Sequence, residues 1–238
     1  MASILKNISV LEKTSLRLKK NFSISESVLI LALYYFFLNN RCGRYRLSKE
    51  LFLSESKTRM LMETLAENSI LTPSKGRSGS NLTEIGFEIC KTIFNHYKIL
   101  NYNKNWKLGE LSVGNINTLI AIPIKTTFSK DFDVLKLRDL IIRSGAQGAT
   151  IFQLKIKNKI FLIDFYQKDF PKFSLNPNLS IPFEKFKKSL EPFFETEDKR
   201  EYWLLVAGSN LTNTKKIPKK DLKFTLLATL QGIIDYGI

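Results

Sequence analysis

The sequence has few of the residues that build metal centres and disulfide frameworks. Its 238 residues include two cysteines, Cys42 and Cys90, and one histidine, His96. A structural zinc site normally takes four Cys or His ligands, and two cysteines cannot form a disulfide network. We therefore expect no metal site and no disulfide-stabilised domain, and the sequence implies no cofactor.

Signatures of the common enzyme classes are also missing. The chain has no Walker phosphate-binding loop, no GxSxG nucleophile elbow, no HExxH metalloprotease motif and no paired CxxC. Each of these motifs places a nucleophile, a base or a metal ligand where its chemistry requires it. Without them no catalytic residue is predicted, and we expect a protein that is not an enzyme.

The apolar run from Val28 to Leu38 is too short for a membrane span. It has 11 residues, whereas a helix needs about 20 to cross a bilayer. Asn39, Asn40 and Arg41 follow it, in place of the small residues of a signal-peptide cleavage site. The sequence thus predicts a soluble, cytoplasmic protein with no membrane partner.

Positive charge is abundant. The chain has 37 Lys and Arg residues against 22 Asp and Glu, for a formal net charge of +15. This excess is spread along the whole chain, so the total says little about partners. Between Arg41 and Arg77, however, eight cations, mostly arginines, stand against four glutamates. Because arginine binds guanine and phosphate well, this stretch is a candidate nucleic-acid contact.

The same stretch has the spacing of two helices joined by a tight turn. Leu47 to Phe52 predicts a short helix, and Ser54 can cap a second one by accepting from free N–H groups of its first turn. This is helix-turn-helix spacing, in which the second helix contacts bases near its N-terminus. The second helix is expected to bury Thr58, Leu61, Met62 and Leu65 and to expose Ser56, Lys57, Arg59, Met60 and Glu63.

A β-wing is predicted after these helices. Ile70 to Ser74 and Ser80 to Thr83 flank a segment, Lys75 to Gly79, that contains two glycines and two cations. Glycines allow the tight turn, and the cations Lys75 and Arg77 would lie at its tip. We therefore expect a basic two-stranded wing.

From Leu51 to Gly86 the sequence resembles the winged helix-turn-helix of MarR-type and related prokaryotic transcription regulators. The ending Asn81-Leu-Thr-Glu-Ile-Gly86 is similar to that family's wing-to-helix junction of leucine, threonine, any two residues and glycine. The resemblance covers Ser23 to Lys91. It departs from the family pattern at Thr58, where a larger aliphatic residue is usual.

The resemblance implies a set of DNA-contacting residues. Matched by position, the first turns of the second helix fall where the family reads DNA, and the wing cations fall where it meets the backbone. The expected DNA-binding residues are Arg46, Ser54, Ser56, Lys57, Arg59, Lys75, Arg77 and Ser78. Winged helices also serve as protein-docking modules, so that role stays open.

Three more segments complete a predicted N-terminal domain over residues 1–100. Residues 1–22 lack a clean helical pattern, and we expect a loosely packed extension, with a dimer arm or a DNA-contacting tail as alternatives. Ser23 to Glu26 predicts a capping box for an apolar helix from Val28 to Leu38. Thr83 is expected to cap a helix from Glu84 to about Leu100. The surplus apolar surface of these helices predicts a homodimer.

The polar stretch from Asn101 to Asn115 predicts a domain boundary. Beyond it, strands are expected at 118–124, 149–156, 159–164 and 202–208, and helices at 133–144, 183–194 and 221–235. This order is that of a ferredoxin-like βαββαβ domain with an extra C-terminal helix, over residues 116–238. The fold class is therefore α+β. Leu137 to Thr150 also resembles the appended domain of uncharacterised archaeal winged-helix proteins, which implies no activity.

Two glycine turns in this second domain could admit a small ligand. Gly145 to Gly148 could offer backbone N–H groups to an anion, and Gly208 to Asn210 follows a strand where ligands often bind. The candidate ligand-binding residues are Arg138, Arg143, Gln147, Gly148 and Ser209, with the arginines favouring an anionic effector. In the plainer interpretation the glycines cap a helix, and Asp139 pairs with Arg143 on the surface.

These observations favour a transcription regulator that binds double-stranded DNA as a homodimer. Its C-terminal domain would sense a small anionic effector or mediate assembly. The alternative is a winged-helix interaction module that docks a protein of a transcription or repair complex.

Overall fold

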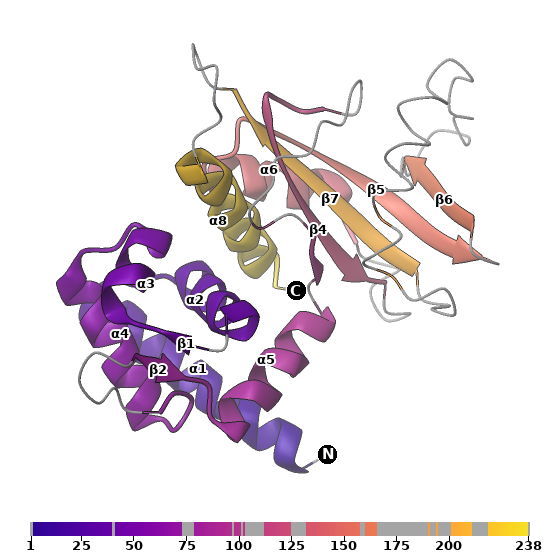
Figure 1. Cartoon of the computed structure of the whole chain (residues 1–238). Coiled ribbons are helices and arrows are strands. Elements are labelled where there is room, and N and C mark those ends of the chain that lie inside the picture. Colours follow the sequence, from indigo (N-terminus) through magenta and orange to yellow (C-terminus); the bar gives the residue numbers. More distant parts are fainter. Residues whose placement is uncertain are drawn as a thin grey trace. The chain divides into compact units, whose positions relative to one another are not determined.

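The computed structural model of the chain is an α+β protein (Figure 1). The structure describes residues 2–39, 41–72, 79–96, 98–100, 102, 112–124, 132–157, 160–165, 190, 194, 201–210 and 219–237. The chain divides into two compact units, Met1–Asn95 and His96–Ile238. This division comes earlier than the predicted boundary, because α5 (Glu84–His96) ends before Leu100 and the next residues form strand β3 (Lys98–Ile99) of the second unit.

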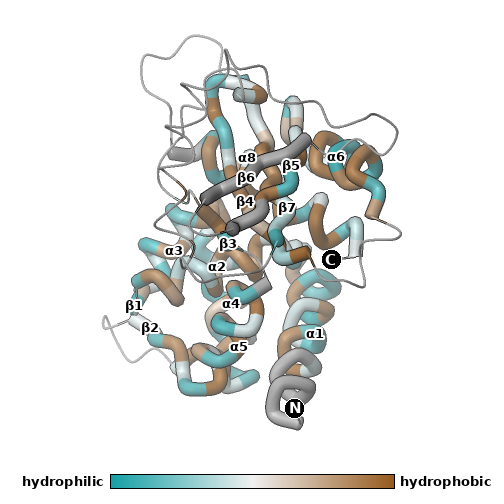
Figure 2. The backbone as a smooth tube through the Cα atoms, turned by 90° about the vertical axis from the view of Figure 1, so that its right-hand side faces the viewer, coloured by the Kyte–Doolittle hydropathy of each residue, from teal (hydrophilic) through white to brown (hydrophobic). Residues whose placement is uncertain are grey.

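The first unit begins with a helix, α1 (Ala2–Phe22), so the expected loose extension is wrong. Figure 2 shows hydrophilic and hydrophobic segments alternating along it. Its buried side includes Thr14, Ser15 and Leu18, and it packs against α2 (Glu26–Asn39) and α4 (Glu55–Glu67). The pattern was obscured because two of these residues are polar. The Thr14 hydroxyl donates to the Val10 carbonyl at 2.7 Å, which lets it be buried.

The predicted capping box at Ser23 to Glu26 is also wrong. Ser23 has a φ of 53° and belongs to the end of α1, where its N–H donates to the Lys19 carbonyl at 3.2 Å. Ser25 is instead beside the first turn of α2, and its Oγ accepts from the Val28 N–H at 3.4 Å. As expected, α2 is buried on several sides.

Strand β1 (Arg41–Cys42) and helix α3 (Arg44–Leu51) follow α2, so this helix starts three residues before its expected beginning at Leu47. After α4 the chain returns as strand β2 (Ser80–Asn81), which pairs antiparallel with β1. Leu71 forms an antiparallel bridge with Leu82, and the Thr72 N–H donates to the Asn81 carbonyl at 2.8 Å. Residues 71–72 therefore lie on the other side of β2 from β1. Thr83 then caps α5, as predicted, by accepting from the Gly86 N–H at 3.0 Å.

The second unit contains a five-stranded antiparallel sheet with the order β3-β4-β7-β5-β6. Figure 1 shows β4, β7, β5 and β6 side by side. The strands after β3 are β4 (Ile116–Pro123), β5 (Gly148–Lys157), β6 (Ile160–Phe165) and β7 (Glu201–Ser209). Helices α6 (Val134–Arg143) and α8 (Lys219–Tyr236) lie against each other. α6 packs on β5, and α8 packs on β4 and β7. The strands and the helices predicted at 133–144 and 221–235 are confirmed to within two residues at each end, and β3 was not expected.

The strand order differs from that of a ferredoxin-like sheet. In that arrangement the third strand of the βαββαβ series lies between the first two, whereas here β7 lies between β4 and β5 and β6 lies outside β5. β7 is buried at seven successive positions, and so is β4. Strands that are apolar on both faces belong in the middle of a sheet, which explains why β7 takes the central place.

Side chains on both faces of this sheet are buried. On one face Leu190 and Phe194 join the sheet residues Leu119, Ala121, Phe152, Leu154, Tyr202, Leu204 and Val206. The rest of the helix predicted at 183–194 lies outside the described residues. The opposite face receives α6 and α8, where the Thr118 and Thr229 hydroxyls are 3.1 Å apart.

Candidate nucleic-acid interface

The N-terminal half of α4 has the geometry that the sequence predicts. Ser54 is its N-cap, and the Ser54 Oγ accepts from the Lys57 N–H at 3.2 Å. The tight turn before it begins at Phe52, whose left-handed conformation (φ 53°, ψ 31°) ends α3. Of the expected DNA-binding residues on this helix, Ser54, Ser56, Lys57 and Arg59 are all exposed, whereas Thr58, Leu61, Met62 and Leu65 are buried.

The structure shows how a threonine fits at position 58, where the resembling family usually has a larger aliphatic residue. It is fully buried, and its hydroxyl donates to the Ser54 carbonyl at 2.9 Å. A buried hydroxyl that has a hydrogen-bond partner costs little. The polar residue therefore fits an apolar position and adds a second contact to the N-cap.

Arg59 does not present a free cation. Its Nε donates to the Glu63 Oε1 at 2.8 Å, and this hydrogen bond raises the pKa of the guanidinium. Both side chains are about half exposed or more, so solvent screens the pair strongly. Exchanging Glu63 for a phosphate or a base would cost little. Even so, α4 carries three glutamates against two cations.

Arg46, the DNA-binding residue predicted on α3, is exposed but lies against α2. Its guanidinium carbon is 5.8 Å from the centre of the Tyr35 ring. Burial raises the pKa of the nearby Cys42 thiol to about 11, and the charge of Arg46 works in the opposite direction. Arg46 therefore has a structural contact besides any role at the surface.

Sequence reasoning left out other exposed side chains of β1 and α3. Arg41, Arg44, Tyr45 and Lys49 are all exposed, and the Lys49 Nζ lies 4.3 Å from the centre of the Tyr45 ring. With Arg46 these residues form what we call the α3 surface. The local excess of cations after Arg41 was visible in the sequence. The resemblance directed attention to the second helix and the wing instead.

The wing residues Lys75, Arg77 and Ser78 lie outside the described residues. Gly79, which follows these residues, is described and lies close to strand β1. Gly79 has a φ of 78°, and a Cβ atom there would lie 2.8 Å from the Cys42 carbonyl oxygen. A glycine is therefore required at this point beside β1, where the predicted wing would begin its return.

The two glycine turns of the second unit come together. The Gln147 N–H donates to the Gly208 carbonyl at 2.9 Å, and the Asn210 N–H donates to the Gln147 Oε1 at 2.6 Å. The space beside Gly148 is filled, because a Cβ atom there would lie 2.5 Å from a Val113 methyl group. Three of the candidate ligand-binding residues, Gln147, Gly148 and Ser209, thus share one end of the sheet. Several of their polar groups already bind protein.

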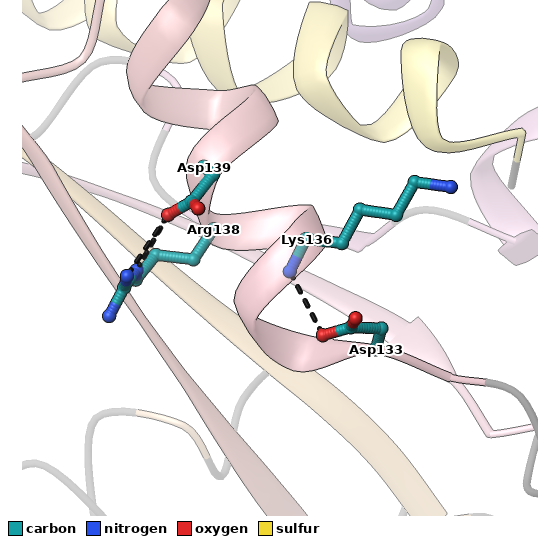
Figure 3. Close-up of polar contacts among 4 residues, drawn as sticks. All are labelled: Asp133, Lys136, Arg138 and Asp139. Atoms are coloured by element: carbon teal, nitrogen blue, oxygen red, sulfur yellow. Dashed lines mark hydrogen bonds and ion pairs between the residues drawn. The ribbon is translucent and has the colours of Figure 1, made fainter.

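The other two candidate residues lie on α6. Arg138 donates to Asp139, with an Arg138 Nη2 to Asp139 Oδ1 distance of 3.0 Å (Figure 3). The expected pair between Asp139 and Arg143 is therefore wrong, because the guanidinium of the neighbouring residue takes the carboxylate. Arg143 is exposed at the last residue of the helix. Ser209 is also engaged, since its Oγ lies 3.0 Å from the Thr225 hydroxyl that donates to it.

The described part of the chain contains neither a cluster of metal ligands nor a membrane-spanning helix. There, no three His, Cys, Asp or Glu side chains gather closely enough to hold a metal ion. No helix among those residues is both long and apolar enough to cross a bilayer.

Comparisons with known proteins identify one distant structure. No protein-family model matches the sequence, and no curated protein is significantly similar to it. A solved structure, the hypothetical protein PH0730 from Pyrococcus horikoshii OT3, aligns over 87% of this chain and 94% of its own, with 19% identity and a TM-score of 0.49. Similarity at this level carries no argument about function.

Proposed function

We propose that the protein is a transcription regulator that binds double-stranded DNA through a winged helix-turn-helix in residues 1–95. The observation that carries the proposal is the capped N-terminus of α4, where Ser56, Lys57 and Arg59 are exposed above a buried apolar face. α3 and a tight turn precede it, and the antiparallel contacts of residues 71–72 with 80–82 follow it. Elements in this order present a helix N-terminus to a major groove.

In this proposal α4 supplies the contacts that distinguish sequences. Lys57 and Arg59 have the chemistry to donate to guanine, and the Ser56 hydroxyl can donate or accept at any base edge. The cap and the buried face fix the direction of these side chains, because α4 cannot rotate without exposing Leu61 and Leu65. The wing cations Lys75 and Arg77 would add phosphate contacts that do not depend on sequence.

Binding to duplex DNA is the direct test, and α5 offers a matched control. Arg59 pairs with Glu63 at 2.8 Å, and Lys91 pairs with Glu88 at 3.1 Å, both pairs on exposed helix surfaces. With the full chain and an operator identified by genome-wide occupancy, Arg59→Ala should lose about 1 to 3 kcal/mol of binding and relax the sequence preference. Lys91→Ala should leave both unchanged. A wild-type protein that binds no duplex at low salt would overturn the proposal.

The second unit is proposed as a domain that senses an effector or mediates assembly. Effector sensing would use the turns at Gln147 to Gly148 and at Ser209, together with the exposed Arg143, which favours an anion. A thermal-shift screen of anionic metabolites and nucleotides tests it. Stabilisation that is lost in Arg143→Ala, with a change in operator affinity, supports sensing. Stabilisation that persists in Arg143→Ala argues against this site.

A protein-docking module is the second candidate, and one observation favours it. Ile85 and Phe87 on α5 are 44% and 42% exposed, and the Phe87 ring lies 5.4 Å from the Phe37 ring. The partly exposed contact between Phe87 and Phe37 is of the kind found at protein interfaces. If a protein partner is recovered without DNA, and Phe87→Ser releases it while Arg59→Ala does not, docking replaces DNA binding as the function.

A further inference from the structure

Helix α6 has apolar side chains on two of its sides. Leu137 and Ile141 are fully buried, and Ile141 lies against Gly232 of α8. Leu135 and Ile142, in contrast, are 60% and 38% exposed. Because these two residues are seven positions apart, they lie on one line along the helix. α6 therefore presents a second apolar line to solvent.

This exposed line is on the side of α6 that faces away from α8. Two contacts mark the side that faces α8: Ile141 lies against Gly232, and the Lys136 ammonium is 5.5 Å from the centre of the Tyr236 ring. Figure 3 shows Lys136 leaving α6 in a different direction from Arg138. Successive helix residues are turned by about 100°. Leu135 and Ile142 therefore lie about 180° from the midpoint of those two contacts.

The sheet continues on this side of α6. α8 packs on β4 and β7, α6 packs on β5, and β6 follows β5 at the edge of the sheet. Packed helices are about 8 to 10 Å apart and neighbouring strands about 4.8 Å apart, so two helices span about four strands. A helix placed against Leu135 and Ile142 would therefore be the third helix of this layer, on the side of β6.

The charge of α6 indicates what kind of helix would fit there. Over Val134–Arg143 the helix has three cations and one acid, Asp139, which already binds Arg138. The two other cations, Lys136 and Arg143, are exposed. A partner helix with acidic residues beside its apolar face would be attracted to them, whereas a second copy of α6 would bring the same positive charge.

We propose that α6 is a docking surface for an acidic amphipathic helix of another protein. That helix packs its apolar face on Leu135 and Ile142 and presents Asp or Glu side chains to Lys136 and Arg143. This inference develops the assembly role proposed for the second unit and does not depend on DNA binding. It also uses a different surface from the contact between Phe37 and Phe87 in the first unit.

Two designed helical peptides test this surface on the full chain. Both have leucines along one face, and one has glutamates beside the leucines where the other has lysines. Fluorescence anisotropy of the labelled peptides should show micromolar binding of the acidic peptide and at least about tenfold weaker binding of the basic one. Failure of the acidic peptide to bind, or equal binding of the two peptides, overturns the inference.

Variants of the protein locate the bound peptide. Leu135→Ser with Ile142→Ser should weaken binding of the acidic peptide by about tenfold or more, because apolar contact is lost. Phe224→Ser is the matched control, since Phe224 is 47% exposed on α8, and it should leave binding unchanged. Arg143→Glu should weaken the acidic peptide and strengthen the basic one. Circular dichroism confirms that each variant is folded. Acidic-peptide binding that is unaffected by the double variant overturns the assignment to α6.

Two further measurements separate the possible outcomes. If Leu135→Ser with Ile142→Ser converts a wild-type dimer to a monomer in light scattering, α6 is a contact between copies and the inference fails. Duplex DNA binding of the wild-type protein is measured separately. Loss of the peptide interaction with DNA binding retained rejects only the docking surface, and peptide binding without DNA binding rejects only the proposed regulator function.

Discussion

Gly232 of α8 lies so close to Ile141 of α6 that a Cβ atom at position 232 would be 2.7 Å from the Ile141 Cα. The two helices therefore meet backbone to backbone at this point. Such an approach is open only to glycine, and it sets the spacing of the helices that cover one face of the sheet.

Gly232→Val should lower the free energy of unfolding of the second unit by about 1 to 3 kcal/mol, because the added side chain must push the helices apart. Both tryptophans of the chain, Trp106 and Trp203, belong to this unit, so their fluorescence in urea reports its unfolding. Gly43→Ala in the first unit is a control for glycine replacement as such, and far-ultraviolet circular dichroism in urea measures it. A Cβ atom there meets nothing within 4 Å and the φ is −88°, so stability should stay within about 0.5 kcal/mol.

Ser54→Ala should cost the first unit about 1 kcal/mol, because it removes the cap that accepts from the Lys57 N–H. Ser56→Ala is the matched control, since Ser56 is exposed in the first turn of α4 and makes no capping bond. Far-ultraviolet circular dichroism in urea measures the difference. Equal stability of the two variants would mean that the cap contributes nothing.

The two thiols should make the folded state less stable at high pH. Burial raises the pKa of Cys42 to about 11 and of Cys90 to about 12, from 9.0. The unfolded chain loses these protons first, so their contribution to stability is complete below pH 9 and is lost as the pH rises through 11 to 12. Spectroscopic titration of the thiolates, native and in urea, checks this. Cys42→Ala with Cys90→Ala should remove that part of the pH dependence, and native thiols that titrate near pH 9 would contradict it.

The proposed homodimer should appear at twice the 27.4 kDa chain mass in light scattering at micromolar concentration. Leu38, Ile85 and Phe87 are large apolar side chains that are 42 to 49% exposed on α2 and α5, and a second copy is the occupant that we expect. Phe87→Ser should shift the mass toward the monomer. If the wild-type protein has the mass of a monomer both with and without DNA, the homodimer prediction is wrong.

Local rules predicted much of the first unit. The cap at Ser54 and the apolar positions of α4 depend on residues within one or two turns, and the structure has them as expected. The helical form of residues 2–22 was missed because its stability comes from packing on α2 and α4, which no local pattern contains. Ser23 was misassigned because a serine can end one helix as well as begin another.

In the second unit the elements were predictable and their arrangement was not. Hydrophobic runs and a helix C-cap predicted strands β4, β5, β6 and β7 and helices α6 and α8 to within two residues. The position of β7 between β4 and β5 depends on pairing between segments far apart in sequence. β3 was missed because a two-residue strand leaves no periodic pattern.

In the candidate site, too, local features were predictable from the sequence and contacts between side chains were not. Exposure of Ser56, Lys57 and Arg59 followed from helix geometry, but the pair between Arg59 and Glu63 and the availability of Arg44 required coordinates. For the second unit, the sequence named two glycine turns as candidates but did not predict that they lie together. It did not reveal that Val113 fills the space beside Gly148.

The close approach of Gly79 to the Cys42 carbonyl couples the position of strand β1 to that of the backbone at the base of the predicted wing. Because no side chain fits between them, any substitution at position 79 would displace Arg41 on β1 as well as the wing. In a mutational scan read out by DNA binding, position 79 should therefore be among the least tolerant, although it lies on neither helix of the helix-turn-helix. Its loss would resemble the loss of several phosphate contacts at once, with α4 still folded and correctly capped.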